Sequence, residues 1–136
     1  MLKTHVAKET VVRMPNQIGV LDGMAKHVAE AGINLLAVTA WVEDGDAVFR
    51  LLTDEDVRTA DLMREMGHRV RQTDVLVTEM PHTPGMLHRV AQTLAQGGVD
   101  ITHLYATATG DQDRCLVVLG TSDNDHAMVV LNKAGL

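Results

Sequence analysis

Two stretches of the chain share one pattern of apolar and polar positions. Residues 15–40, PNQIGVLDGMAKHVAEAGINLLAVTA, align without a gap over residues 81–106, PHTPGMLHRVAQTLAQGGVDITHLYA. Seven positions are identical, Gly19/Gly85 among them, and most other apolar positions stay apolar. The offset of 66 residues is longer than the periods of about 20 to 50 residues that are typical of solenoids. The pattern therefore indicates a small unit that has been duplicated.

Each copy predicts the same order of elements. A β-rich run leads into a loop with Pro and Gly, and a helix follows whose apolar residues recur every three or four positions on one face. A glycine ends this helix as a left-handed cap does, and two strands joined by a tight turn lead to a second helix. In the first copy these elements are the run 10–14, a helix ending at Gly32, a strand from Ile33, a turn at 43–46, a strand 47–52, and a helix that begins at 53–54 and ends near Gly67. In the second copy they are the run 75–80, a helix ending at Gly98, a strand from Val99, a turn at 110–112, a strand 114–119, and a helix that begins at 122–123 and ends near Gly135.

Strand, helix, strand, strand, helix is the split βαβ order. It predicts an α+β fold of two ferredoxin-like βαββαβ units in tandem, residues 1–72 and 73–136, each an antiparallel sheet with helices on one face. Residues 68–73 can close the first sheet as its fourth strand. The second unit reaches Leu136 without such a strand, so either the chain is truncated or another strand fills the gap.

The predicted strand 33–41 is apolar on both of its faces. Strict alternation predicts that one set of side chains faces the helices, while the other set, which is apolar too, faces away. The first set is Ile33, Leu35, Ala37, Thr39 and Trp41, and the second is Leu36, Val38 and Ala40. Because apolar faces need partners, we expect the protein to be at least a homodimer.

Composition and charge exclude several classes of protein. The chain is 46% hydrophobic and 22% charged, which is an ordinary globular composition, and its formal net charge of -6 with 2% aromatic residues argues against a nucleic-acid partner. The single cysteine, Cys115, allows no intrachain disulfide and indicates a reducing compartment. The longest uncharged apolar stretch, 33–42, is too short for a membrane span, and the first residues carry no signal-peptide core. We expect a cytoplasmic protein without a membrane partner.

The loop before the first helix of each copy is the candidate for chemistry. Unpaired backbone N–H groups and the positive end of the helix dipole can hold a carboxylate there, although a helix start needs a turn and a cap in any case. The first copy adds two amides, Asn16 in the loop and Asn34 just after the helix. Asn34 could equally be a capping residue. At the corresponding positions the second copy has His82 and Asp100.

At these residues the sequence resembles the ACT domain family of small-molecule regulatory modules. The resemblance rests on Asn-x-x-Gly-x-Leu in 16–21 with Gly-Ile-Asn-Leu in 32–35, and on Thr-Pro-Gly-Met-Leu in 83–87 with Gly-Val-Asp-Ile in 98–101. It covers nearly the whole chain twice, and it is greatest with the short stand-alone proteins made of two ACT units. The resemblance implies that an amino acid binds where two units meet and that its binding is passed to an enzyme or transcription factor.

The resemblance also implies a set of ligand-binding residues. In the serine-sensing branch of the family, asparagines in the loop and after the first helix hold the ligand, and Asn16 and Asn34 match those positions. In the second copy, the charge of Asp100 would oppose a carboxylate and Pro84 removes one backbone donor, so we expect the first copy to carry the better site. The full predicted set is Asn16, Gln17, Ile18, Gly19, Val20, Leu21, Asn34, His82, Thr83, Pro84, Gly85, Met86, Leu87 and Asp100.

These observations favour a non-enzymatic protein that binds a small amino acid and modulates amino-acid metabolism, with no cofactor and no metal. Seven histidines are many for this length, but none has ligand spacing such as His-x-x-x-His. Two alternatives stay open. One is a regulatory or assembly subunit of a metabolic enzyme that has no ligand of its own, and the other is a small metal-dependent enzyme that uses His82, His88 and Asp100.

Overall fold

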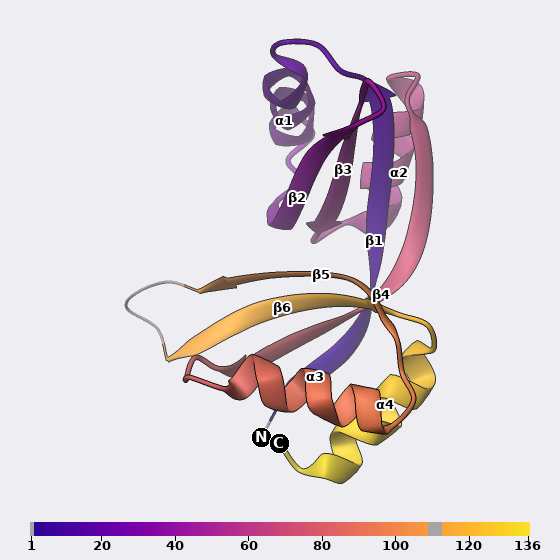
Figure 1. Cartoon of the computed structure of the whole chain (residues 1–136). Helices are drawn as coiled ribbons and strands as arrows, with labels where there is room; N and C mark the ends of the chain where they lie inside the picture. Colours follow the sequence, from indigo (N-terminus) through magenta and orange to yellow (C-terminus); the bar gives the residue numbers. More distant parts are fainter. Residues whose placement is uncertain (1, 109–112) are drawn as a thin grey trace. The chain divides into compact units, whose positions relative to one another are not determined.

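The structure is a computed structural model that describes residues 2–108 and 113–136 (Figure 1). The predicted order of elements is confirmed in both copies. The elements are β1 (Lys3–Pro15), α1 (Val20–Glu30), β2 (Leu35–Glu43), β3 (Asp46–Thr53), α2 (Asp56–Glu65), β4 (Arg69–Pro81), α3 (Met86–Gln96), β5 (Ile101–Ala108), β6 (Arg114–Thr121) and α4 (Asn124–Ala134). No helix among the described residues is long and apolar enough to cross a membrane.

The elements form two compact units, and two long strands take part in both. The first unit is Lys8–Thr73, and the second unit joins residues 2–7 to Asp74–Leu136. The hydrogen-bonded order of the strands is β2-β3-β1-β4-β6-β5. Each unit therefore has a four-stranded antiparallel sheet, to which β1 and β4 contribute one segment each.

The start of β1 is the fourth strand of the second unit. Thr4 and Thr78 join β1 to β4 by a hydrogen bond of 2.8 Å between their hydroxyl oxygens. Leu2 packs against the core of this unit, and its backbone N–H donates to the carbonyl of Leu136. Another strand, the start of β1, therefore fills the gap in the second unit, as one of the two predicted explanations expects.

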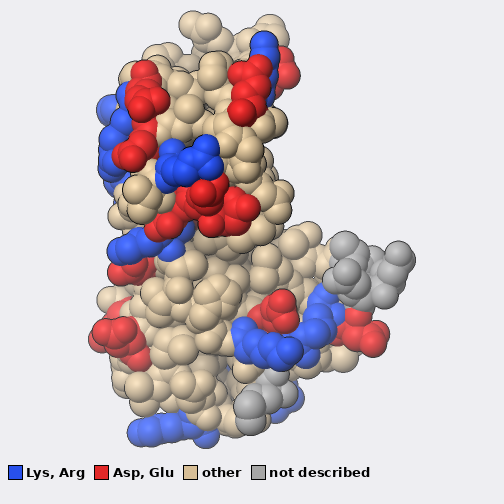
Figure 2. Space-filling view, turned by 180° about the vertical axis from the view of Figure 1, so that it is seen from behind, with Lys and Arg blue, Asp and Glu red and all other residues tan. Residues whose placement is uncertain are grey.

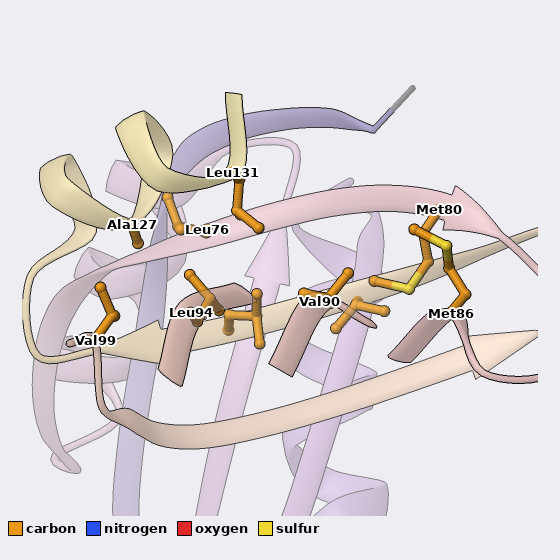
Figure 3. Close-up of a cluster of buried hydrophobic side chains, with 10 residues drawn as sticks. Leu76, Met80, Met86, Val90, Leu94, Val99, Ala127 and Leu131 are labelled. Atoms are coloured by element: carbon orange, nitrogen blue, oxygen red, sulfur yellow. The ribbon is translucent and has the colours of Figure 1, made fainter. Parts of the chain in front are cut away.

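Each unit has its own apolar core between its sheet and its two helices. In the second unit Val90 and Leu94 of α3 meet Leu76 of β4 and Leu131 of α4, and all four are at most 3% exposed (Figure 3). The first unit repeats this arrangement around one large residue, Phe49. Its buried cluster is Val12, Met14, Met24, Val28, Ile33, Ala47, Phe49, Leu51 and Met63.

The prediction for the faces of β2 is wrong beyond Leu35. A β-bulge shifts the register between Leu35 and Ala37, so that Trp41 pairs with Val48 and Ala40 pairs with Phe49. Because one extra residue moves all later side chains to the other face, Ala37, Thr39 and Trp41 lie on the face away from the helices. Val38 and Val42 lie on the helix side but remain 46% and 60% exposed at the sheet edge.

The start of the second helix differs from the prediction in the first unit and agrees with it in the second. Helix α2 begins after Glu55 with no side-chain cap, because the Asp54 carboxylate accepts a hydrogen bond from the Asn34 backbone N–H at 3.0 Å instead. Helix α4 has Asp123 as its N-cap, with its carboxylate accepting from the His126 N–H at 3.0 Å, so there the N-cap prediction is confirmed.

The predicted turns and helix ends follow the glycines. The β2–β3 hairpin turns through Asp44 (φ 50°) and Gly45 (φ 79°), as a two-residue loop requires. The corresponding turn at 110–112 lies outside the described residues. The caps predicted at Gly32 and Gly98 are confirmed by their φ of 72° and 76°.

Candidate ligand-binding site

The two predicted loops have almost the same backbone conformation. Gly19 before α1 and Gly85 before α3 have φ of 89° and 85°, and neither helix start has a side-chain cap. The loops are tied to their hairpins by backbone bonds, Asn16 N–H to the Gly45 carbonyl at 2.9 Å and His82 N–H to the Asp113 carbonyl at 2.6 Å. Free N–H groups of the first helical turn are therefore available to an acceptor at both places.

In the second unit, this loop borders a hollow of about 420 Å³. Its lining is mostly apolar, and it includes Ala106 from β5 and Cys115 from β6. Five of the predicted ligand-binding residues meet here, which are His82, Thr83, Gly85, Met86 and Leu87. An apolar hollow with a few convergent polar groups at its edge is the usual form of a small-molecule site.

The charges at the two helix starts differ. Helix α1 has Asp22 in its first turn, whereas α3 has no acidic residue there and has His88 at the matching position. A carboxylate near α1 would meet the negative charge of Asp22, while the first turn of α3 has no acidic residue to oppose a carboxylate held by the positive end of the helix dipole. The second unit therefore offers the better electrostatic setting for an anionic group.

The predicted loop residues of the first unit are mostly exposed. Asn16, Gln17, Gly19 and Leu21 lie at the surface, and Val20 is half-buried against the core. Ile18 is fully exposed. The backbone at this helix start resembles the one in the second unit, but the side chains of the loop are exposed.

The residues after the helices do not join the loops within a unit. Asn34 lies beyond the far end of α1, which has 11 residues and is therefore about 16 Å long. Its backbone exchanges hydrogen bonds with Asp54, and the backbone of Asp100 does the same with Ser122. Both side chains are exposed, so a role for Asn34 or Asp100 in ligand binding stays a prediction.

The residues of the alternative metal site, His82, His88 and Asp100, do not cluster in the structure. Within the part of the chain that the structure describes, no three His, Cys, Asp or Glu side chains lie close enough together to hold a metal ion. His82 and His88 are both exposed residues at the hollow, and Asp100 lies beyond the opposite end of α3.

The far wall of the hollow consists of residues that were not predicted from the sequence. Ala106, Thr107 and Ala108 come from β5, and Cys115 and Val117 come from β6. Ala108 pairs with Cys115 in the hairpin, and Met80 pairs with Cys115 on the other side. Only the register of three strands brings these residues to the loop, although the aligned alanines Ala40 and Ala106 were a weak signal for a small residue there.

Comparisons with known proteins agree with this fold. A protein from Bacteroides thetaiotaomicron, BT0572, matches with a TM-score of 0.89 and 25% identity over 97% of this chain and 90% of its own. Regulatory subunits of aspartate kinase share the fold. The one from Thermus thermophilus, in its ligand-free form, has a TM-score of 0.65 and 16% identity over 98% of this chain and 95% of its own, and the one from Thermus flavus has a TM-score of 0.64 and 18% identity over 100% and 96%. No curated protein matches the sequence.

The family described as "ACT domain pair" matches residues 6–136, which is nearly the entire chain. This match agrees with the duplicated βαββαβ units, the positive-φ glycine at both helix starts and the four-stranded antiparallel sheet of each unit. The chain belongs to the family of ACT domain pairs.

Proposed function

We propose that this protein is a non-catalytic regulatory protein that binds a small amino acid in the hollow of the second unit. The observation that carries the proposal is the meeting of a hollow of about 420 Å³ with the uncapped start of α3. Membership of the ACT family and the structural likeness to aspartate kinase regulatory subunits support a regulatory role.

The lining suggests how an amino acid would be oriented. The backbone N–H groups of Leu87 and His88, in the first turn of α3, face no acidic residue in that turn and can donate to the α-carboxylate. The hydroxyl of Thr83 can accept a hydrogen bond from the ammonium group. The side chain would then lie against Met86 and Cys115, which suits a small apolar or weakly polar residue.

The protein would transmit this binding to a partner. We propose a homo-oligomer, because β2 and β5 are sheet edges that carry exposed Val38, Val42 and Leu104. A metabolic enzyme is the proposed target of regulation. The competing possibility is an assembly subunit without a ligand of its own, and ligand binding separates the two.

Thermal shift with a panel of amino acids tests the proposal. A ligand present at about 100 times its Kd adds about 2.7 kcal/mol to the free energy of unfolding, so the shift is measurable. Ala106→Leu would fill the hollow and should abolish the shift. Ala40→Leu is the matched control at the aligned position in β2 of the first unit, and it should leave the shift unchanged.

The reverse pattern would place the site in the first unit, as predicted from the sequence. The absence of a shift with every amino acid would favour the assembly subunit. Light scattering on both variants checks that an added leucine at a sheet edge has not changed the oligomeric state.

A further inference from the structure

The first unit has four arginines on the face of its sheet that points away from the helices. They are Arg13 of β1, Arg50 of β3, and Arg69 and Arg71 of β4. Together with Trp41 they line a hollow of about 440 Å³, and every residue that lines it belongs to this unit. The β-bulge in β2 is what brings Trp41 to this face.

This cluster is not a property of the fold. In the second unit, Glu79 and Val118 occupy the positions of Arg13 and Arg50. This correspondence follows from strand pairing, because Met14 pairs with Ala47 in the first unit and Met80 pairs with Cys115 in the second. The chain has only 12 Lys and Arg side chains and a net charge of -6, so four arginines around one hollow are a local concentration. Figure 2 shows basic and acidic groups next to one another on the face that it draws, without a large area of one sign.

Three carboxylates lie among the arginines and order them. Arg50 donates to the buried Glu9 at 2.6 Å, and Arg13 donates to Asp46 at 2.8 Å and to Glu43 at 3.0 Å. Arg69 donates to the same Asp46 oxygen at 2.9 Å. The guanidinium of Arg13 holds the pKa of Asp46 below its usual value, so this carboxylate stays ionised.

These carboxylates do not saturate the arginines. Each guanidinium has five N–H donors, and Arg13 and Arg69 share one oxygen of Asp46. Arg69 is 72% exposed, and no described residue forms an ion pair with Arg71, which is exposed as well. Donors on two neighbouring arginines of β4 are therefore available to a further acceptor.

We propose that this hollow binds a small organic anion through a phosphate or carboxylate group. Planar guanidinium groups match both kinds of group with paired hydrogen bonds. Arg69, Arg71 and Arg13 would hold the anionic group, and the rest of the ligand would lie against Trp41, which is 39% exposed. Arg50, 5.8 Å from the centre of the Trp41 ring, fixes that ring. The proposal is independent of the amino-acid hollow in the second unit.

Trp41 makes a direct test possible, because it is the only tryptophan of the chain. The full chain is titrated with inorganic pyrophosphate and, separately, with citrate at constant ionic strength, while tryptophan fluorescence is recorded. We expect a saturable change with one of them at one site per chain. Saturation by pyrophosphate alone assigns a phosphate ligand, and saturation by citrate alone assigns a carboxylate ligand.

Two variants show whether the signal comes from this hollow. Arg71→Gln, which removes no ion pair to a described residue, should lower the affinity at least fivefold, and Arg69→Gln/Arg71→Gln should lower it at least tenfold. Arg64→Gln is the control, because Arg64 lies in α2 of the same unit and is 53% exposed. The proposal is overturned if neither anion gives a saturable change, or if Arg64→Gln weakens binding as much as Arg71→Gln does.

Discussion

The two units carry different residues at one equivalent place in their sheets. In the first unit Glu9, which is 0% exposed, pairs with Arg50, whose side chain is 14% exposed. In the second unit, the same strand positions hold Val75 and Val118, which are at most 1% exposed. The backbone accepts charged residues at both positions in one unit and apolar residues at both positions in the other.

The second unit buries apolar residues at both positions, so the fold itself does not require a charged pair there. Burying two charges costs desolvation energy that their attraction only partly offsets, so an apolar pair of similar volume is often equally stable or better. The ion pair does hold the guanidinium of Arg50 beside Trp41 on the arginine-lined face. Its presence in the first unit only is therefore in keeping with the proposed anion site.

The largest effect is expected from breaking this pair on one side. Glu9→Val leaves the charge of Arg50 without its carboxylate and should lower the free energy of unfolding by about 3 kcal/mol. The double variant Glu9→Val/Arg50→Val copies the second unit and should recover most of that loss. Urea unfolding followed by Trp41 fluorescence measures both, and a double variant as unstable as Glu9→Val would refute the equivalence of the two pairs.

A smaller and equal effect is expected at the two helix starts. Gly19→Ala and Gly85→Ala force alanine into a positive φ, which costs about 1 to 2 kcal/mol. Apart from the two chain neighbours, no described residue has an atom within 4 Å of either added Cβ. The two stability losses should agree within about 0.5 kcal/mol. In ligand titrations Gly85→Ala alone should weaken amino-acid binding, and an effect of Gly19→Ala alone would move the site to the first unit.

Exchanging one charge should sharpen the contrast between the two loops. His88→Asp places in α3 the acid that α1 has at Asp22. It should weaken amino-acid binding about threefold, because the added carboxylate repels the ligand's carboxylate at a helix start where charge effects amount to about 0.3 to 1 kcal/mol. Calorimetric titration measures the change. Tighter binding by His88→Asp would mean that the ammonium group, and not the carboxylate, faces α3.

The smallest effect concerns the residue after the last helix of each unit. His68 follows Gly67 where Leu136 follows Gly135, and burial, with the nearby His27, lowers the pKa of His68. The unfolded chain therefore binds a proton at a higher pH than the folded chain, so stability falls as the pH drops through about 6.5. Thermal melts of wild type and His68→Leu at pH 7.5 and 5.5 should show a smaller loss of stability at the lower pH in the variant. Leucine is chosen because Leu136 occupies the equivalent position in the second unit. An equal loss in both proteins would assign the sensitivity to other groups.

The sequence by itself determined the local features of this protein. The duplication, the helices α1 and α3, the left-handed Gly32 and Gly98, and the N-cap at Asp123 were all predictable. Each depends on residues a few positions apart, whose periodicity and backbone preferences are visible in one stretch of chain. Five of the predicted loop residues also meet at one hollow because they are close in sequence, namely His82, Thr83, Gly85, Met86 and Leu87.

Only the tertiary structure decided the features that join distant segments. The fourth strand of the second unit comes from β1, with Thr4 bonded to Thr78 across 74 residues, and the far wall of the hollow comes from β5 and β6. The bulge at Leu35–Ala37 turned Trp41 toward the arginines of β1, β3 and β4. Strand pairing and register are set by burial and hydrogen bonding summed over the whole sheet, and no local stretch of sequence contains that sum.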